Sequence, residues 1–155
     1  AQVERLQPVL AELRIAMLEQ PLPAGADDAL HGFAALVPIC ADESCHVTAD
    51  LDRLRTRYSM VNIKLDKTGG LTEALDLLAG ARTMGLGVMV GCMVGTSLSM
   101  APAFHVAQQA DFADLDGPWL MREDRPGGLA FAADGRVPPP VAGFWGTTRA
   151  TPPGA

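Results

Sequence analysis

Short apolar runs recur along the first 118 residues, at an interval of about 23–25 residues. Each run has the length of a strand, and successive positions within it are apolar, which is typical of strands covered on both faces. We therefore expect strands at Ile15–Leu18, Val37–Ala41, Met60–Leu65, Gly87–Gly91 and Phe112–Leu115.

Helical patterns separate these runs. Apolar residues keep helical spacing over residues 3–13 and again over residues 71–81. Asp27-Asp28 and Thr48 are residue types that begin helices. Strands that alternate with helices predict βαβ units and a parallel sheet, so the fold class is α/β.

Five such units can close in two ways. They can form a complete doubly wound open sheet, or about five-eighths of a (β/α)8 barrel. The period of the pattern does not decide between the two. The pattern itself stops near Pro118, and residues 119–155 are rich in Gly and Pro. We expect residues 1–118 to form the α/β unit, and residues 119–155 to form a short hairpin near 127–135 and an irregular tail.

Composition excludes several function classes. A net charge of −6 without a basic stripe argues against a nucleic-acid partner. The three cysteines, Cys40, Cys45 and Cys92, have no CxxC or zinc spacing, which favours reduced thiols in a cytoplasmic protein. Residues 83–110 carry no charge, but glycines interrupt the stretch, so we interpret it as a buried strand, a loop and a buried helix rather than a membrane span.

Charged residues stand where the expected strands end. Glu19 follows the first run and Asp42 the second. The carboxyl ends of parallel strands are where sites form in both candidate folds. Two hard oxygen donors on neighbouring strands suit Mg²⁺. The alternative is that both are solvated loop carboxylates at the start of the next helix.

The third run carries a lysine among apolar residues. Lys64 is costly to bury unless its pKa falls or a carboxylate pairs with it. A lysine of lowered pKa is a general base, whereas a paired lysine is a structural ion pair, and both interpretations stay open. Lys67 lies just beyond the run, and we expect it to be a surface or loop residue.

The fifth run ends in two carboxylates. Asp114 and Asp116 are two residues apart, so on a strand both side chains would point the same way. They would repel each other unless a cation such as a substrate ammonium group or a metal ion lies between them. The alternative is a turn, since Asp-Gly-Pro favours one.

Five motifs in order carry a family resemblance. They are LEQP, ADES, NIKLDKTGG, GCMVGTS and FADLDGP, and they run through the chain to about Pro118. The chain resembles the enolase superfamily in its muconate-lactonizing branch, and is most similar to L-Ala-D/L-Glu (dipeptide) epimerases. The resemblance implies that the motifs belong to strands 4–8 of a (β/α)8 barrel.

The resemblance also implies roles for individual residues. Glu19 and Asp42 match Mg²⁺ ligands, and Lys64 matches an acid/base lysine that moves the α-proton next to a carboxylate, by way of a metal-stabilised enediolate. Asp114 and Asp116 match the pair that holds the α-ammonium group of a dipeptide. The loop after the fourth run would line the substrate pocket through Cys92, Met93, Thr96 and Ser97.

The resemblance is to part of a protein. The N-terminal capping domain, the first three barrel strands, the third metal ligand and the opposing lysine base are absent from these 155 residues. We therefore expect this chain alone to be inactive, with the missing half as its partner. A homo-oligomer stays open. Competing hypotheses are an N-succinyl-amino-acid racemase or o-succinylbenzoate synthase of the same superfamily, and a flavodoxin-like Mg²⁺-binding receiver or binding module.

Overall fold

The computed structural model describes residues 2–145, and its centre is a sheet of five parallel strands. Each strand pairs with the next one along the chain, in the order β1-β2-β3-β4-β5. The strands are β1 (Leu18–Glu19), β2 (Ile39–Ala41), β3 (Met60–Ile63), β4 (Gly87–Val90) and β5 (Phe112–Ala113).

The strand order decides between the two candidate folds. A doubly wound sheet reverses direction at a switch point, and the flavodoxin-like order is 2-1-3-4-5. Sequential order without reversal is the arrangement of a (β/α)8 barrel. The sheet is therefore part of a barrel, and the flavodoxin-like alternative is wrong as a fold assignment.

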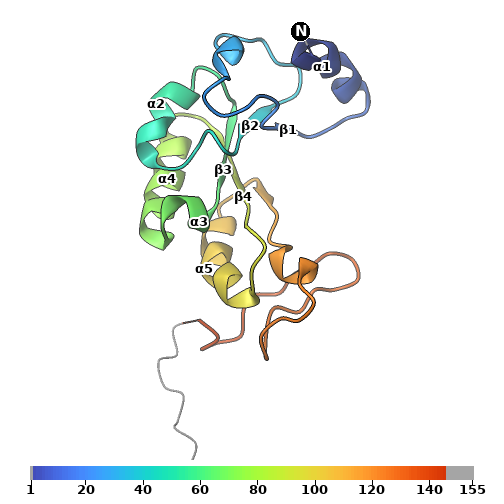
Figure 1. Ribbon diagram of the computed structural model, residues 1–155, viewed down its shortest axis with the longest axis vertical. Helices are drawn as coiled ribbons and strands as arrows, with labels where there is room; N and C mark the ends of the chain where they lie inside the picture. Colours follow the sequence, from blue (N-terminus) through green and yellow to red (C-terminus); the bar gives the residue numbers. More distant parts are fainter. Residues whose placement is uncertain (1, 146–155) are drawn as a thin grey trace, which may run out of the picture.

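Helices cover one face of the sheet. In Figure 1, α2, α4 and α5 lie on the same side of the strands, and α4 contacts both β3 and β4. The α-helices are α1 (Gln2–Glu12), α2 (Leu51–Leu54), α3 (Leu65–Thr68), α4 (Leu71–Thr83) and α5 (Ser97–Ala107), and the 3-10 helices are η1 (Asp28–Leu30), η2 (Thr48–Asp50) and η3 (Gly117–Leu120). None of the helices within residues 2–145 is long and apolar enough to cross a bilayer.

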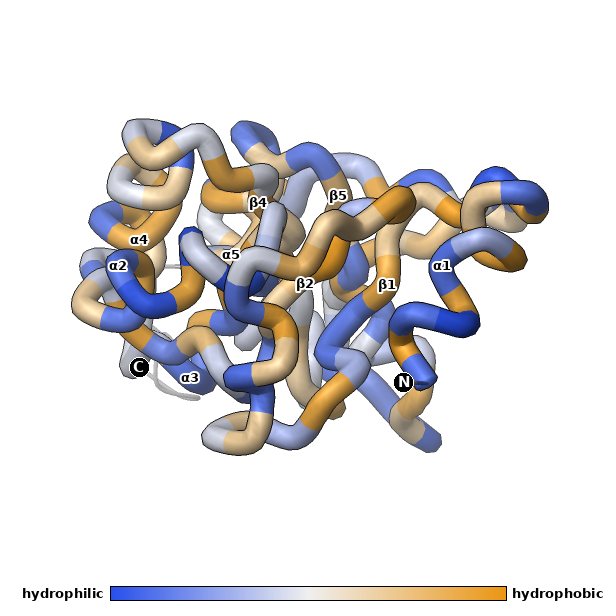
Figure 2. Tube along the Cα trace, turned by 90° about the horizontal axis from the view of Figure 1, so that it is seen from above, coloured by the Kyte–Doolittle hydropathy of each residue, from blue (hydrophilic) through white to orange (hydrophobic). Residues whose placement is uncertain are grey.

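The two faces of the sheet carry alternate residues of each strand. The helix-covered face contributes Ile39, Ala41, Val61, Ile63, Val88 and Val90 to the main core. The opposite face carries a small cluster of Cys40, Met60 and Met89. In Figure 2, apolar positions lie along the strands and also on the helices that cover them. Because side chains alternate, residues two positions beyond this small cluster also belong to the inner face of the barrel.

Both edges of the sheet are open. β1 and β5 each pair with one neighbour, and the residues of β5 are exposed. Large apolar side chains remain exposed near these edges, among them Ile15 at 42%, Phe112 at 37% and Trp119 at 66%. Open edges and exposed apolar side chains are the features that a closed barrel removes.

The element boundaries differ from the sequence predictions at several points. β3 ends at Ile63 rather than Leu65, because α3 begins directly after Lys64. The hairpin expected near residues 127–135 has no strands. The backbone there forms turns, one of them closed by the Ala132 N–H donating to the Arg136 carbonyl at 2.9 Å.

Candidate functional site

Strand register places the first three candidate residues on one face. Glu19 is opposite Cys40, and Asp42, the residue after β2, lies two positions beyond Cys40 on the same side. Lys64, the residue after β3, keeps the parity of Met60, which faces the inner side. Glu19, Asp42 and Lys64 thus meet at the carboxyl ends of adjacent strands, on the face away from the covering helices.

Asp42 is the centre of this group. Its Oδ2 accepts from the Lys64 Nζ at 2.7 Å, and its Oδ1 accepts from the Lys67 Nζ at 2.7 Å. The Asp42 side chain is 9% exposed, and the two lysine side chains are 14% and 7% exposed. A carboxylate held by two ammonium groups in a nearly buried position is a strong local electrostatic feature.

The ion pairs set the protonation states. Burial alone would raise the pKa of Asp42, but its hydrogen bonds to Lys64 and Lys67 and their charges hold the pKa below its usual value. Burial alone would lower the pKa of Lys64, but Asp42 outweighs this effect and raises it. In the structure Lys64 is paired with Asp42, and its pKa is raised rather than lowered.

Lys67 is not the surface residue that its sequence position indicates. It lies in α3, one helical turn after Lys64, and that turn brings its ammonium group back over the end of β3. There it also donates to the Asp42 carbonyl at 2.6 Å and to the Asn62 carbonyl at 3.0 Å. Lys67 thus joins the ends of β2 and β3.

Glu19 is held from β3. Its Oε1 accepts from the Asn62 Nδ2 at 2.6 Å, while the Asn62 Oδ1 is buried without a hydrogen-bond partner. Space for this group comes from Gly91 at the end of β4. A Cβ there would stand 2.8 Å from the Asn62 Oδ1 and 2.9 Å from the Lys64 Cε, so any side chain would displace both.

The donor set fits Mg²⁺. Glu19 and Asp42 provide carboxylate oxygens on neighbouring strands, and the unpartnered Asn62 Oδ1 leaves a further hard oxygen beside them. In this structure the two Asp42 oxygens accept from the ammonium groups of Lys64 and Lys67. Within residues 2–145 no three His, Cys, Asp or Glu side chains converge as a complete metal-binding group. A Mg²⁺ ion here requires further ligands.

Asp114 and Asp116 come together by a turn rather than by strand parity. β5 ends at Ala113, although the Asp114 N–H still donates to the Val90 carbonyl at 2.9 Å. Asp116 begins η3. Burial, the charge of Asp114 and a hydrogen bond between the two side chains raise the pKa of Asp116. The two carboxylates thus lie side by side just beyond the end of β5.

The loop after β4 packs against this turn. A Cβ on Gly117 would stand 2.5 Å from the Met93 carbonyl and 3.2 Å from the Cys92 Sγ, so glycine permits the close approach. Cys92 and Thr96 are half-buried and Met93 is exposed. Val94 is exposed as well, at 67%, and Gly95 is half-buried, so the accessible part of the loop runs over residues 92–96.

Ser97 has a different environment from the rest of the loop. It is fully buried, its N–H donates to the Asp124 Oδ1 at 2.9 Å, and its hydroxyl donates to the other Asp124 oxygen. The same hydroxyl accepts from the Leu129 N–H at 2.8 Å. Asp124 thus takes up the first amide of α5, and Ser97 fastens the segment after η3 to this helix.

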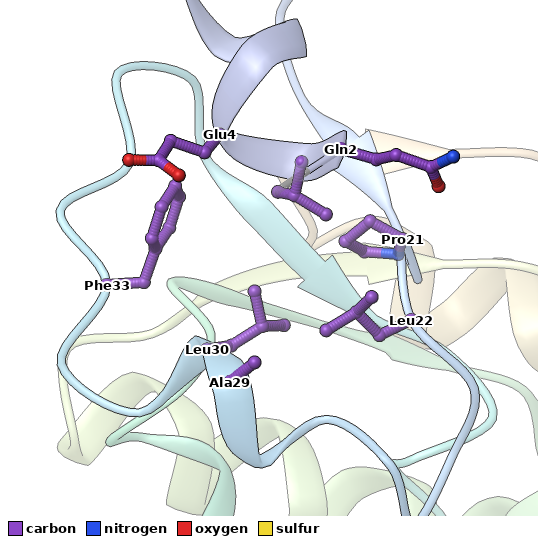
Figure 3. A pocket seen from close by; sticks show the side chains of 8 residues that line it. Gln2, Glu4, Pro21, Leu22, Ala29, Leu30 and Phe33 are labelled. Atoms are coloured by element: carbon purple, nitrogen blue, oxygen red, sulfur yellow. The ribbon is translucent and has the colours of Figure 1, made fainter.

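A hollow also lies away from these strand ends. A cavity of about 450 Å³ separates α1 from η1 and the segment after β1, and Figure 3 shows Phe33, Leu30 and Leu22 pointing into it. Its lining is largely apolar, and none of the nine candidate site residues contributes to it. The candidate chemistry therefore belongs to the strand ends and not to this cavity.

Four residues of the site were missed by sequence reasoning. They are Gln20, whose side-chain Oε1 accepts from the Asp42 N–H at 2.7 Å, and Asn62, Lys67 and Gly91. Asn62 carried a signal, since it is the one uncharged polar residue inside an apolar run. The other three depend on the fold, because their partners lie on other strands or across a helical turn.

Two curated relatives are racemases or epimerases. The chain is 52% identical over 137 residues to an N-acetyl-D-glutamate racemase from Pseudoalteromonas sp, covering 88% of this chain and 43% of the relative. It is 56% identical over 119 residues to the L-Ala-D/L-Glu epimerase of Escherichia coli, covering 76% of this chain and 37% of that enzyme. The chain thus spans about two-fifths of the length of these relatives.

Two solved structures share the fold. An enolase family member from Agrobacterium tumefaciens with homology to dipeptide epimerases, with bound sodium and L-Ala-L-Glu, matches with a TM-score of 0.89 and 54% identity, over 94% of this chain and 44% of that one. A dipeptide epimerase from Methylococcus capsulatus, complexed with Mg and L-Arg-D-Lys, matches with a TM-score of 0.80 and 35% identity, over 88% and 41%.

These matches agree with the strand order, which makes the sheet part of a barrel. The family model described as enolase C-terminal domain-like matches residues 1–144, almost the whole of the described structure. The chain therefore belongs to the enolase C-terminal domain-like family.

Proposed function

We propose that the protein carrying this chain is a Mg²⁺-dependent dipeptide epimerase of the L-Ala-D/L-Glu type. The observation that carries the proposal is the hydrogen bond from the Lys64 Nζ to the Asp42 Oδ2, at the carboxyl ends of β3 and β2. In this arrangement an amine that moves protons lies beside carboxylates that suit a metal ion, as α-proton chemistry next to a carboxylate requires.

Lys64 moves the α-proton in this proposal. Paired with Asp42 it is protonated, which is the form that returns a proton to the α-carbon, and the neutral amine is the form that removes one. Glu19 and Asp42 hold the metal ion. When bound, Mg²⁺ supplies Lewis-acid stabilisation of the negative charge that develops on the substrate carboxylate.

The acidic pair fixes the other end of the substrate. Asp114 and Asp116 bind the α-ammonium group of the dipeptide, and Cys92, Met93 and Thr96 line the substrate loop. Ser97 supports that loop through Asp124.

Epimerization requires a second base on the opposite face and a further metal ligand. We place both outside residues 1–155, so this chain alone is inactive. The buried free thiols of Cys40 and Cys45 suit a cytoplasmic protein.

A second candidate is an N-acyl-amino-acid racemase. The observation that favours it is the 52% identity to an N-acetyl-D-glutamate racemase. This reaction uses the same α-proton chemistry on a substrate whose nitrogen carries no charge. The two candidates therefore differ in what Asp114 and Asp116 must bind.

Proton NMR in D2O tests the proposal, using the full-length protein that contains this chain. L-Ala-L-Glu and L-Ala-D-Glu are incubated separately with Mg²⁺, and N-acetyl-D-glutamate serves as the competing substrate. We expect both dipeptides to lose the Glu α-proton signal and to interconvert. Lys64→Ala should abolish interconversion and stop α-proton exchange in at least one epimer. Turnover of N-acetyl-D-glutamate alone would support the racemase instead.

A further inference from the structure

Gln20 connects the two strand ends that carry Glu19 and Asp42. It directly follows Glu19, and its backbone N–H donates to the Cys40 carbonyl at 2.9 Å, which continues the pairing of β1 with β2. Its side-chain Oε1 accepts from the Asp42 N–H at 2.7 Å and from the Ser44 N–H at 3.2 Å. One residue therefore holds β1 and the segment after β2 by both backbone and side chain.

The side-chain amide nitrogen of Gln20 is also held by hydrogen bonds. Three acceptors lie within its reach, the Leu22 carbonyl at 2.8 Å, the Ser44 Oγ at 2.9 Å and the Tyr58 Oη at 3.0 Å. Both hydroxyl groups in turn donate to Asp27, at 2.7 and 2.8 Å.

A buried ion pair holds the two hydroxyl groups that contact the Gln20 amide. The Asp27 carboxylate is 1% exposed and pairs with the Arg57 guanidinium at 3.0 Å. Such a network holds its members in one arrangement because each polar group would be costly to leave unpaired. The Gln20 amide is therefore fixed in position by groups outside the candidate metal site.

The backbone of Gln20 is held in a rare conformation. Its φ is +33°, in the left-handed region that residues other than glycine seldom adopt. Such strain persists where surrounding contacts over-determine the geometry, often at functional sites. At Gln20 those contacts are the hydrogen bonds of its side chain and its backbone N–H.

From these contacts we infer that Gln20 is a positioning residue that fixes the separation and direction of Glu19 and Asp42, and thereby sets the affinity for Mg²⁺. The inference rests on the proposed function, in which these two carboxylates hold the metal ion. Gln20 does not touch the substrate or the metal. It acts through the backbone that presents both carboxylates, and groups that orient metal ligands strongly influence affinity.

The chain offers a matched control for this inference. Gln7 is also a buried glutamine, 2% exposed, whose Oε1 accepts a backbone N–H, that of Val37 at 2.7 Å. Val37 precedes β2, whereas Asp42 follows it. Gln7→Met and Gln20→Met therefore remove the same kind of hydrogen bond at opposite ends of one strand.

The test measures Mg²⁺ affinity by titration calorimetry in the full-length protein, together with the unfolding temperature in EDTA. We expect both variants to unfold at lower temperature than the unsubstituted protein. Gln20→Met should also weaken Mg²⁺ binding by about tenfold or more, whereas Gln7→Met should leave the dissociation constant unchanged. If Gln20→Met does not fold, Tyr58→Phe removes one partner of the amide, and a smaller loss of affinity is expected.

Two outcomes oppose the inference, and they differ in what they overturn. An unchanged Mg²⁺ dissociation constant in folded Gln20→Met, or an equal loss in Gln7→Met, would overturn the role of Gln20 alone. Absence of Mg²⁺ binding by the unsubstituted protein would overturn the proposed function, and the inference with it.

Discussion

The Lys67 ammonium group donates to both the carboxylate and the main-chain carbonyl of Asp42, at 2.7 and 2.6 Å. A third acceptor, the Asn62 carbonyl, lies 3.0 Å away, so every N–H of the ammonium group has a partner. The Lys64 ammonium group donates to the same carboxylate, and this is the one hydrogen bond it makes within residues 2–145. The two ammonium groups are therefore held differently, although only two residues separate the lysines.

Lys67→Met is expected to destabilise the fold. Removing one partner of a buried ion pair costs about 3–5 kcal/mol, because the remaining charge and carbonyls lose their compensation. Lys64→Met should cost less, since Lys64 is more exposed and makes one bond. Urea denaturation of the full-length protein in EDTA measures both differences.

An exposed ion pair provides the control for the lysine variants. Arg136 pairs with Asp134 at 2.6 Å, but its side chain is 86% exposed, so Arg136→Ala should cost less than about 1 kcal/mol. Equal stability losses for Lys67→Met and Arg136→Ala would contradict a structural role for Lys67.

Asp116→Asn is expected to separate the two candidate activities. The substitution removes a charge that the α-ammonium group of a dipeptide needs, and a charged hydrogen bond contributes about 1.5–3 kcal/mol, or roughly a tenfold to hundredfold loss in kcat/KM for L-Ala-L-Glu. N-acetyl-D-glutamate lacks that charge, so its turnover should change little. Steady-state kinetics with both substrates measures the difference, and equal losses would argue against ammonium binding by this pair.

The stability of the protein in acid is expected to depend on Asp27. Burial alone would raise its pKa, but hydrogen bonds from Ser44 and Tyr58 and the charges of Arg57 and Arg53 hold the pKa below its usual value. A carboxylate with a lowered folded-state pKa contributes stability that is complete above its unfolded-state pKa near 3.9, and this stability is lost as pH falls through the folded-state value.

Asp27→Asn tests this dependence. The variant should be less stable than the unsubstituted protein at pH 7, and the difference should shrink below about pH 4. Urea denaturation midpoints between about pH 3 and pH 7 give both curves. Parallel curves throughout that range would show that Asp27 does not couple folding to protonation.

The sequence alone located the strands and the charged residues at their ends. Apolar runs at a regular interval located all five strands, and Glu19, Asp42 and Lys64 were found because parallel strands end at a common edge. These are local properties, since the end of a strand is visible in the residues that form it. The strand boundaries were predicted less accurately. β3 ends two residues before its predicted end, because α3 begins there.

Tertiary structure decided how these residues are held. Strand order, and with it the choice of a barrel over an open sheet, depends on which strands pair, and the period of the pattern is the same in both folds. Lys67 required a helical turn to return to Asp42, and Gln20 required the register of β1 and β2. Asp124 reaches α5 across 27 residues of chain. Hydrogen bonds between distant residues are set by register and packing, so only the folded chain specifies them.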